Sequence, residues 1–179
     1  MKHQEIINFW FVECEPAQWW KKDTGFDNQL IANYTDLHSA ANACELFNWR
    51  KTAEGRLAEI IVLDQFSRNM FRDMPKSFGS DTLALALSQE AVAVGADLQL
   101  SPTQRSFLYM PYMHSESLLI HEIAVDLFQK NGTPGNLDFE IKHKKIIERF
   151  GRYPHRNRIL GRQSTEEEIK FLAQPGSSF

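Results

Sequence analysis

The stretch GRLAEIIVLDQFSRNMFR, residues 55–72, decides the fold class, because its apolar side chains recur at helical spacing. On a helical wheel at about 100° per residue they form two faces. The first face comprises Leu57, Ile60, Ile61 and Phe71, and the second comprises Val62, Leu63, Phe66 and Met70. A helix that is apolar on two sides is largely buried. We therefore predict a long central helix over residues 53–73, ending before Pro75.

Two charged residues lie in the middle of the first apolar face. Asp64 and Arg68 are four residues apart, and Gln65, Asn69 and Arg72 flank them. Moving an ion out of water costs several kcal/mol, roughly, so buried charges must be paired or heavily hydrogen-bonded. These five residues are therefore candidates for a polar site inside the protein. Because buried Asp–Arg pairs also tie helices together, a structural role is the alternative.

The remaining segments also have helical patterns. We expect helices at residues 2–13, 27–46, 81–95, 115–130 and 136–150. Capping boxes predict two further helix starts, at Ser101 and Ser164. No alternating strand pattern is bounded by hairpin turns. The sequence therefore predicts an all-α protein of about eight helices in a single domain, residues 1–174, followed by a disordered tail, residues 175–179.

The composition excludes several classes of protein. The 179 residues include 20 Lys and Arg, 23 Asp and Glu, and 42% apolar residues, which argues against disorder and against a histone-like polyelectrolyte. No apolar run approaches the roughly 18 residues of a membrane span. Glu5 and Asn8 interrupt the start of the chain, where a signal peptide needs an apolar run. Cys14 and Cys44 are too few for a disulfide framework. We expect a cytoplasmic protein that does not bind membranes.

Two further helices place polar side chains on apolar stripes. Glu116 projects onto the stripe of the helix at 115–130, and His143 falls within the stripe at 136–150. The apolar members of these stripes are Ile120, Ile123, Leu127, Phe139, Ile146, Ile147 and Phe150. Together with Asp64 and Arg68, the two polar residues would form the floor of a pocket. His143 and Glu116 are the candidate catalytic acid–base groups, because burial beside charges can bring either pKa towards neutrality.

A basic segment, residues 142–162, contains eight of the 20 basic residues and only one acid. Its net charge is +7, so the rest of the chain carries −10. Glycine and proline punctuate the run FGRYPHRNRILGR, which predicts a tight turn between two helices. Such a turn can direct guanidinium groups at one phosphate or carboxylate. The predicted anion clamp consists of Arg152, Arg156 and Arg72, with His155 and Asn157 as hydrogen-bonding groups.

Motifs for cofactors and metals are absent or incomplete. Glu140 and His143 match half of a di-iron motif whose second half is missing. His114 and Glu116 could supply two ligands to a divalent metal, but the sequence contains no recognisable complete set of metal ligands. No P-loop, nucleophile elbow or Gly-rich dinucleotide turn occurs. We therefore predict neither a metal nor a cofactor.

Three strings in the chain resemble a known family. Residues 55–72, MPYMHSE at 110–116 and HKKIIERFGRYPHRNRILGRQSTEEE at 143–168 are similar to the bacterial domain of unknown function 924 family, and the resemblance covers nearly the whole chain. It implies a single all-α domain of tetratricopeptide-like helical hairpins and brings no established activity. It adds His114 and Arg162 to the candidate binding residues. Tyr153 stands where the family usually has Phe.

Three roles are compatible with these residues. The first is a pocket for a small phosphate- or carboxylate-bearing ligand, with catalysis left open. The second is a helical adaptor whose basic segment binds an acidic peptide or protein partner. In the third, the polar residues only satisfy one another. Nucleic acid is not expected as a partner, because the rest of the chain would repel a phosphate backbone. For the first role, we expect loss of Arg156 to leave the melting temperature nearly unchanged.

Overall fold

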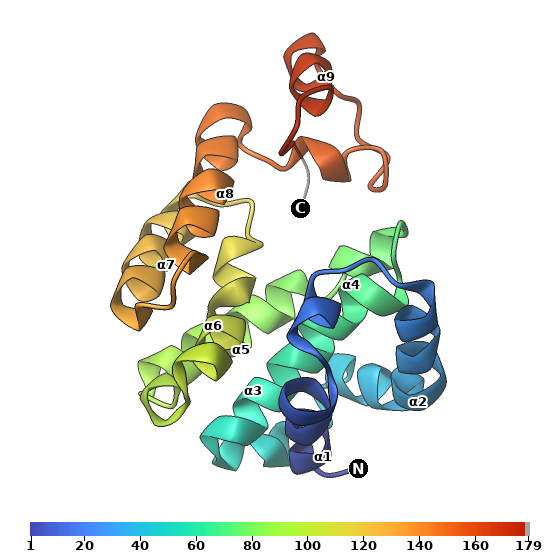
Figure 1. Ribbon diagram of the computed structural model, residues 1–179, viewed down its shortest axis with the longest axis vertical. Helices are drawn as coiled ribbons and strands as arrows, with labels where there is room; N and C mark the ends of the chain where they lie inside the picture. The colour runs from blue at the N-terminus through green and yellow to red at the C-terminus, as the bar shows by residue number, and fades with distance from the viewer. Residues whose placement is uncertain (178–179) are drawn as a thin grey trace.

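The computed structural model describes residues 1–177, and these residues contain helices and connecting turns but no β-strand (Figure 1). The all-α prediction is confirmed. The α-helices are α1 (His3–Asn8), α2 (Thr24–Asn42), α3 (Ala53–Ile61), α4 (Ser67–Met70), α5 (Asp81–Ala93), α6 (Pro102–Met113), α7 (Leu118–Asn131), α8 (Asn136–Phe150) and α9 (Glu166–Leu172). A π-helical turn, Val62–Phe66, joins α3 and α4 into one continuous helix. With that helix counted once, the described residues form eight α-helices, as the sequence predicts, besides short 3-10 and π-helical turns.

The continuous helix from Ala53 to Met70 is the centre of the core, and α3 packs against α1, α5 and α6. Leu57, Leu63 and Phe66 are completely buried, so both predicted apolar faces are covered. Phe66 packs against the ring of Trp10, which also meets Phe107 edge to face. Burying one such large apolar side chain contributes about 1.5–3 kcal/mol. This packing fixes the position of the polar residues on the same helix.

The π-helical turn was not predicted from the sequence. It adds one residue to the turn that contains Asp64 and Gln65, and the helix then ends at Met70 rather than at residue 73. Phe71 lies beyond that end and is only half-buried, and Asp73 has a φ of 62°. Single π turns inside α-helices are frequent at functional sites. The turn here lies at the centre of the predicted polar site.

Helices α6, α7 and α8 pack against one another in sequence order, on the side of the molecule away from α1 and α2 (Figure 1). Two residues predicted to be buried on these helices are exposed instead: Ile123 is 42% exposed and Phe139 is 53% exposed. The inward faces carry His121 and Glu140, both completely buried. The wheel count was wrong here because the inward positions are taken by a hydrogen-bonded pair of polar side chains, which a count of apolar residues does not find.

The C-terminal segment follows α8 through Gly151, whose φ of 66° ends the helix. The last helix begins one residue later than predicted, because Thr165 rather than Ser164 caps it and Glu168 completes the capping box. In the described part of the predicted tail, Ser177 is buried and donates a hydrogen bond to the carbonyl of Leu172, whereas Pro175 and Gly176 are exposed. Residues 178–179 of that tail lie outside the described residues. Within residues 1–177, no helix is long and apolar enough to cross a membrane.

Candidate functional site

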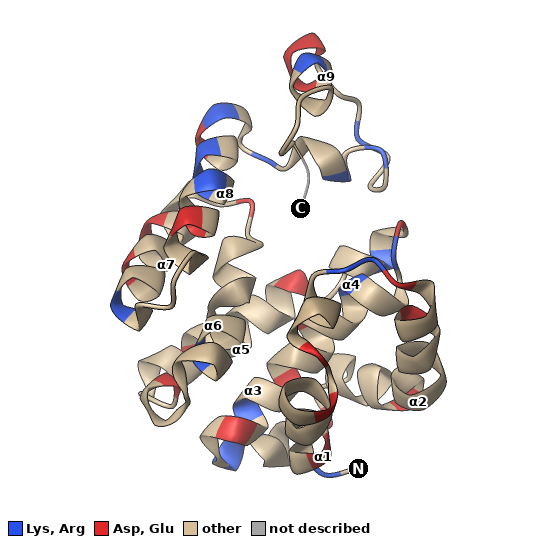
Figure 2. Cartoon of the chain, viewed as in Figure 1, with Lys and Arg blue, Asp and Glu red and all other residues tan. Residues whose placement is uncertain are grey.

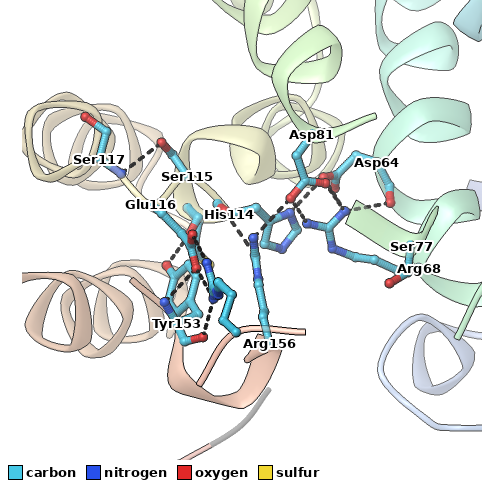
Figure 3. A network of polar contacts seen from close by, with 12 residues as sticks. Asp64, Arg68, Ser77, Asp81, His114, Ser115, Glu116, Ser117, Tyr153 and Arg156 are labelled. Carbon is cyan, nitrogen blue, oxygen red and sulfur yellow. Dashed lines mark hydrogen bonds and ion pairs between the residues drawn. The ribbon is translucent and has the colours of Figure 1, made fainter. Parts of the chain in front are cut away.

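Five side chains from four parts of the chain form one polar cluster (Figure 3). Arg68 is at its centre, because one terminal nitrogen lies 2.9 Å from an oxygen of Asp64 and 3.0 Å from an oxygen of Asp81. The other terminal nitrogen donates to the second oxygen of Asp81 at 3.0 Å. Arg156 reaches that same oxygen at 3.2 Å, and His114 contacts Asp64 at 2.8 Å. The cluster therefore connects the central helix to α5, to the end of α6 and to the C-terminal turn.

Asp64 is a completely buried carboxylate. Besides Arg68 and His114, it accepts a hydrogen bond from Gln65 at 2.6 Å. Burial alone would raise its pKa, but the charge of Arg68 and the hydrogen bonds from His114 and Gln65 hold the pKa of Asp64 well below its usual range. The carboxylate is therefore ionised at neutral pH, as the wheel count required of a buried and paired charge.

His114 follows directly after α6, and its backbone N–H closes the last turn of that helix. Burial and the nearby Arg68 lower the pKa of His114, although Asp64 opposes them. The imidazole is therefore neutral at pH 7. Its Nδ1 faces Asp64, and its Nε2 makes no hydrogen bond to another residue within 1–177. In Figure 3 the ring lies between Arg68 and Arg156.

Arg156 is 6% exposed and lies between two aromatic rings. Its guanidinium carbon is 4.6 Å from the ring centre of Phe78 and 4.6 Å from that of Tyr153. One terminal nitrogen donates to Asp81 and the other to the carbonyl of His114 at 3.0 Å, while Nε is buried without a hydrogen-bond partner among the described residues. Burial and the like charge of Arg68 lower the pKa of Arg156. Its positive charge is therefore incompletely compensated.

A cleft of about 330 Å³ opens beside this cluster. Its polar lining includes Asp81, His114, Glu116 and Arg156, and Phe78, Leu85 and Leu160 form apolar walls. Specific small-molecule sites combine apolar walls with a few convergent polar groups in this way, in volumes of about 300–1,000 Å³. The cleft is at the small end of that range.

Glu116 and Arg162 form a second group at the edge of the cleft. Arg162 donates to both oxygens of Glu116, at 2.6 and 2.9 Å, and to the carbonyl of Tyr153. Glu116 also accepts the backbone N–H of Tyr153 at 2.7 Å. Burial acts to raise the pKa of Glu116, but the hydrogen bond from Arg162 outweighs burial, so the pKa of Glu116 is lowered. Glu116 precedes α7 instead of lying on its face, so the predicted stripe position is wrong.

The remaining members of the predicted anion clamp bind elsewhere. Arg152 donates to both oxygens of Glu168 on α9, and Arg72 donates to both oxygens of Asp27 on α2. Asn69 joins this second pair at 3.0 Å from Asp27. The structure therefore does not bring Arg72 and Arg152 together with Arg156 as one clamp. Helical periodicity cannot reveal Asp27 and Glu168 as the partners of these arginines. In the sequence, both look like ordinary acidic residues in the first turn of a helix.

Figure 2 shows Lys and Arg gathered on α8 and on the segment that follows it, and five of the eight basic residues of the basic segment form ion pairs within the chain. Asn157 is buried and binds Ser164 and Arg162, which closes the turn. Among residues 1–177, only Lys142, Lys145 and Arg158 of the eight basic residues have no ion pair. The five ion pairs of the segment are Lys144–Glu148, Arg149–Glu167, Arg152–Glu168, Arg156–Asp81 and Arg162–Glu116.

The rings of His143 and His155 both lie close to Tyr153, with ring centres 5.8 and 5.5 Å from its own. Burial lowers the pKa of His143 to about 3 and that of His155 to about 4. Neither lines the cleft that Arg156 borders. His143 therefore lies outside the cleft that Glu116, the other residue predicted to act in acid–base chemistry, helps to line.

A buried pair that the sequence analysis missed lies behind the cleft. His121 contacts Glu140 at 2.6 Å through Nδ1, and its Nε2 donates to the carbonyl of Ser115 at 2.9 Å. The hydroxyl of Tyr153 donates to the carbonyl of Met113 at 2.6 Å. These contacts hold the backbone on both sides of His114. Within the described part of the chain, no three His, Cys, Asp or Glu side chains are placed to hold a metal ion.

Comparison with known proteins identifies the family. The model of the family described as bacterial protein of unknown function (DUF924) matches residues 6–176. The chain belongs to this family. The solved structure of a protein of unknown function from Agrobacterium tumefaciens is also similar, with a TM-score of 0.91 and 39% sequence identity, and the match covers 96% of each chain. A comparison with curated proteins gives no match. The function of this DUF924 protein must therefore be argued from its own geometry.

Proposed function

We propose that this DUF924 protein binds a small molecule carrying a phosphate or carboxylate group in the cleft beside Arg156. The observation that carries the proposal is the state of Arg156 itself. Its guanidinium is buried and borders the cleft, its Nε has no partner among the described residues, and its one carboxylate contact is to an oxygen that Arg68 also binds. An anion in the cleft would supply the missing negative charge.

The shape of the cleft supports the same ligand class. Apolar walls formed by Phe78, Leu85 and Leu160 would cover the uncharged part of the ligand, while Arg156 holds the anionic group. Because Asp81 and Glu116 also border the cleft, the anion must approach on the Arg156 side, and a ligand with a single anionic end fits better than a polyanion.

A purely structural network accounts for the other predicted residues better than for Arg156. Arg152 and Arg162 each bind a carboxylate through two nitrogens, which satisfies their charge within the protein. The same ion pairs weaken the alternative of an adaptor for acidic partners, because they leave few free cations on the basic segment.

We also propose a tetratricopeptide-like arrangement, supported by the consecutive packing of α6, α7 and α8. A cytoplasmic location is supported by the two free cysteines, Cys14 and Cys44.

The test is titration calorimetry with inorganic phosphate, glycerol phosphate and succinate. We expect the wild type to bind at least one of them, and Arg156→Lys to bind it about tenfold or more weakly, because lysine cannot keep the planar contacts between the two rings. Arg158→Lys is the matched control, since Arg158 is exposed and has no ion pair to a described residue. No binding by the folded wild type, or equal binding by the Arg156 variant, would contradict the proposal.

A further inference from the structure

The hydrogen-bond pattern determines which nitrogen of His114 carries the proton. The Asp64 carboxylate is ionised, forms an ion pair with Arg68 and accepts a hydrogen bond from Gln65, so it has no proton to donate to the imidazole. The contact of 2.8 Å between Asp64 Oδ1 and His114 Nδ1 therefore requires a proton on Nδ1. A neutral imidazole with that proton has its lone pair on Nε2.

The lone pair on Nε2 is available to a ligand. His114 lines the cleft, and 17% of its side chain is exposed. The other ring nitrogen is fixed by Asp64, and the carbonyl of His114 is fixed by Arg156, so the imidazole has a defined orientation. A buried carboxylate that orients a histidine through Nδ1 and leaves Nε2 open is the arrangement that general-base histidines use.

We infer that His114 is the proton-transferring residue of this cleft, with Asp64 as its positioning residue. The inference rests on the proposed function, because the ligand held by Arg156 is the molecule on which His114 acts. The substrate class is a small phosphate or carboxylate compound that presents a hydroxyl group, or a water molecule bound beside it, to Nε2. In the step, the O–H bond breaks with its electron pair remaining on oxygen, and an N–H bond forms at Nε2. Asp64 then stabilises the imidazolium.

The two residues that the sequence analysis selected for acid–base chemistry are less suitable than His114. Glu116 is engaged through both oxygens by Arg162 and also accepts the N–H of Tyr153. His143 does not line the cleft. The family resemblance placed His114 among the binding residues, and the wheel count did not single it out. His114 lies beyond the end of a helix, where a wheel count gives no information about burial.

Ligand binding and the proton affinity of His114 are coupled in this arrangement. Arg68 opposes protonation of the ring, and Asp64 and Asp81 favour it. An anion at Arg156 adds a negative charge next to the ring, so it raises the pKa of His114 at the moment when a substrate is present. The charged and titratable groups that act on the ring are Asp64 and Arg68 on the central helix, Asp81 on α5, His143 on α8, and His155 and Arg156 in the C-terminal turn.

The first test is histidine ¹⁵N NMR on the ligand-free wild type at pH 7, with His114→Gln used to assign the signals. We expect His114 to be protonated on Nδ1 and unprotonated on Nε2. A proton on Nε2, or on both nitrogens, would overturn the inference. Addition of inorganic phosphate then tests the proposed function separately, because failure to bind phosphate or the calorimetric ligands leaves the ligand-free protonation state unchanged.

The second test is modification by diethyl pyrocarbonate, which reacts with an accessible unprotonated imidazole nitrogen. Peptide mapping should show modification of His114 at least tenfold faster than of His121, which is completely buried with both nitrogens engaged. Asp64→Asn should slow the reaction of His114 several-fold, while Arg158→Lys should not. Equal rates for His114 and His121 in the wild type would overturn the inference without requiring that any variant fold.

Discussion

Arg162 binds Glu116 through both terminal nitrogens of its guanidinium, at 2.6 and 2.9 Å. The two residues are 46 positions apart in the sequence, and Glu116 also accepts the backbone N–H of Tyr153. This pair joins the C-terminal turn to the loop before α7, and the same turn carries Arg156 to the cleft. The ion pair therefore positions the proposed anion-binding residue although it does not itself require a ligand.

Replacing Arg162 with Ala should destabilise the protein by about 2 kcal/mol, because it removes a partly exposed, charge-assisted double hydrogen bond. Urea unfolding followed by circular dichroism measures the change. The control is Arg158→Ala, in the same turn but exposed and without an ion pair to a described residue, which should change stability by less than about 0.5 kcal/mol. Equal effects of the two substitutions would show that the Glu116 pair does not fix the turn.

Replacing Asp64 with Ala should be far more costly, by roughly 3–5 kcal/mol, because it removes one partner of a buried pair and leaves Arg68 and His114 short of an acceptor. The measurement is again the free energy of unfolding in urea. Asp126→Ala, on the exposed face of α7, is the matched control and should have little effect. A loss below about 1 kcal/mol at Asp64 would mean that the carboxylate is not a required member of the network.

The sequence could predict the burial of Asp64 and the partial burial of Arg68 because both lie in the middle of an apolar face of the helix. It could not predict Asp81, because that residue looks like a solvated first-turn acid on another helix. The same reason explains the error at Arg152: Glu168 belongs to a capping box, and only the folded turn shows that it also binds Arg152. Helical periodicity determines the face of a helix, but it carries no information about which distant helix meets that face.

The pH dependence of stability should include a contribution from His143. Its pKa in the folded protein is about 3, below the value of roughly 6.5 for an unperturbed histidine, so the unfolded chain binds the proton more readily. The stabilising effect is therefore complete above pH 6.5 and is lost as the pH falls below it, at up to about 1.4 kcal/mol per pH unit. Unfolding free energies measured between pH 7 and 4 should fall less steeply in His143→Gln. If the unfolding free energy fell with pH as steeply in His143→Gln as in the wild type, the result would contradict the burial of His143 as a neutral imidazole.

Arg156 should contribute to stability as well as to binding, which changes the expectation from sequence that its loss leaves the melting temperature unaltered. The guanidinium fills the space between Phe78 and Tyr153 and donates to the carbonyl of His114. Arg156→Ala should therefore cost about 2–4 kcal/mol through the cavity and the lost hydrogen bonds. Thermal and urea unfolding of this variant provide the measurement, and an unchanged melting temperature would support the earlier expectation.

The hydroxyl of Tyr153 offers a specific test of how the backbone before His114 is held in place. The hydroxyl donates to the carbonyl of Met113 at 2.6 Å and lies 3.1 Å from Nε2 of His121, in a fully buried setting. Tyr153→Phe should cost about 1–2 kcal/mol, since a buried carbonyl loses its donor while the ring packing is retained.

Tyr34→Phe is the matched control for this substitution. Tyr34 is also a buried ring in the core, but its hydroxyl makes no hydrogen bond to another residue within 1–177. Its removal should therefore leave the unfolding free energy within about 0.5 kcal/mol of the wild type. If Tyr153→Phe were equally harmless, the carbonyl of Met113 would have found another donor, and the hydroxyl would not be what holds the backbone before His114 in place.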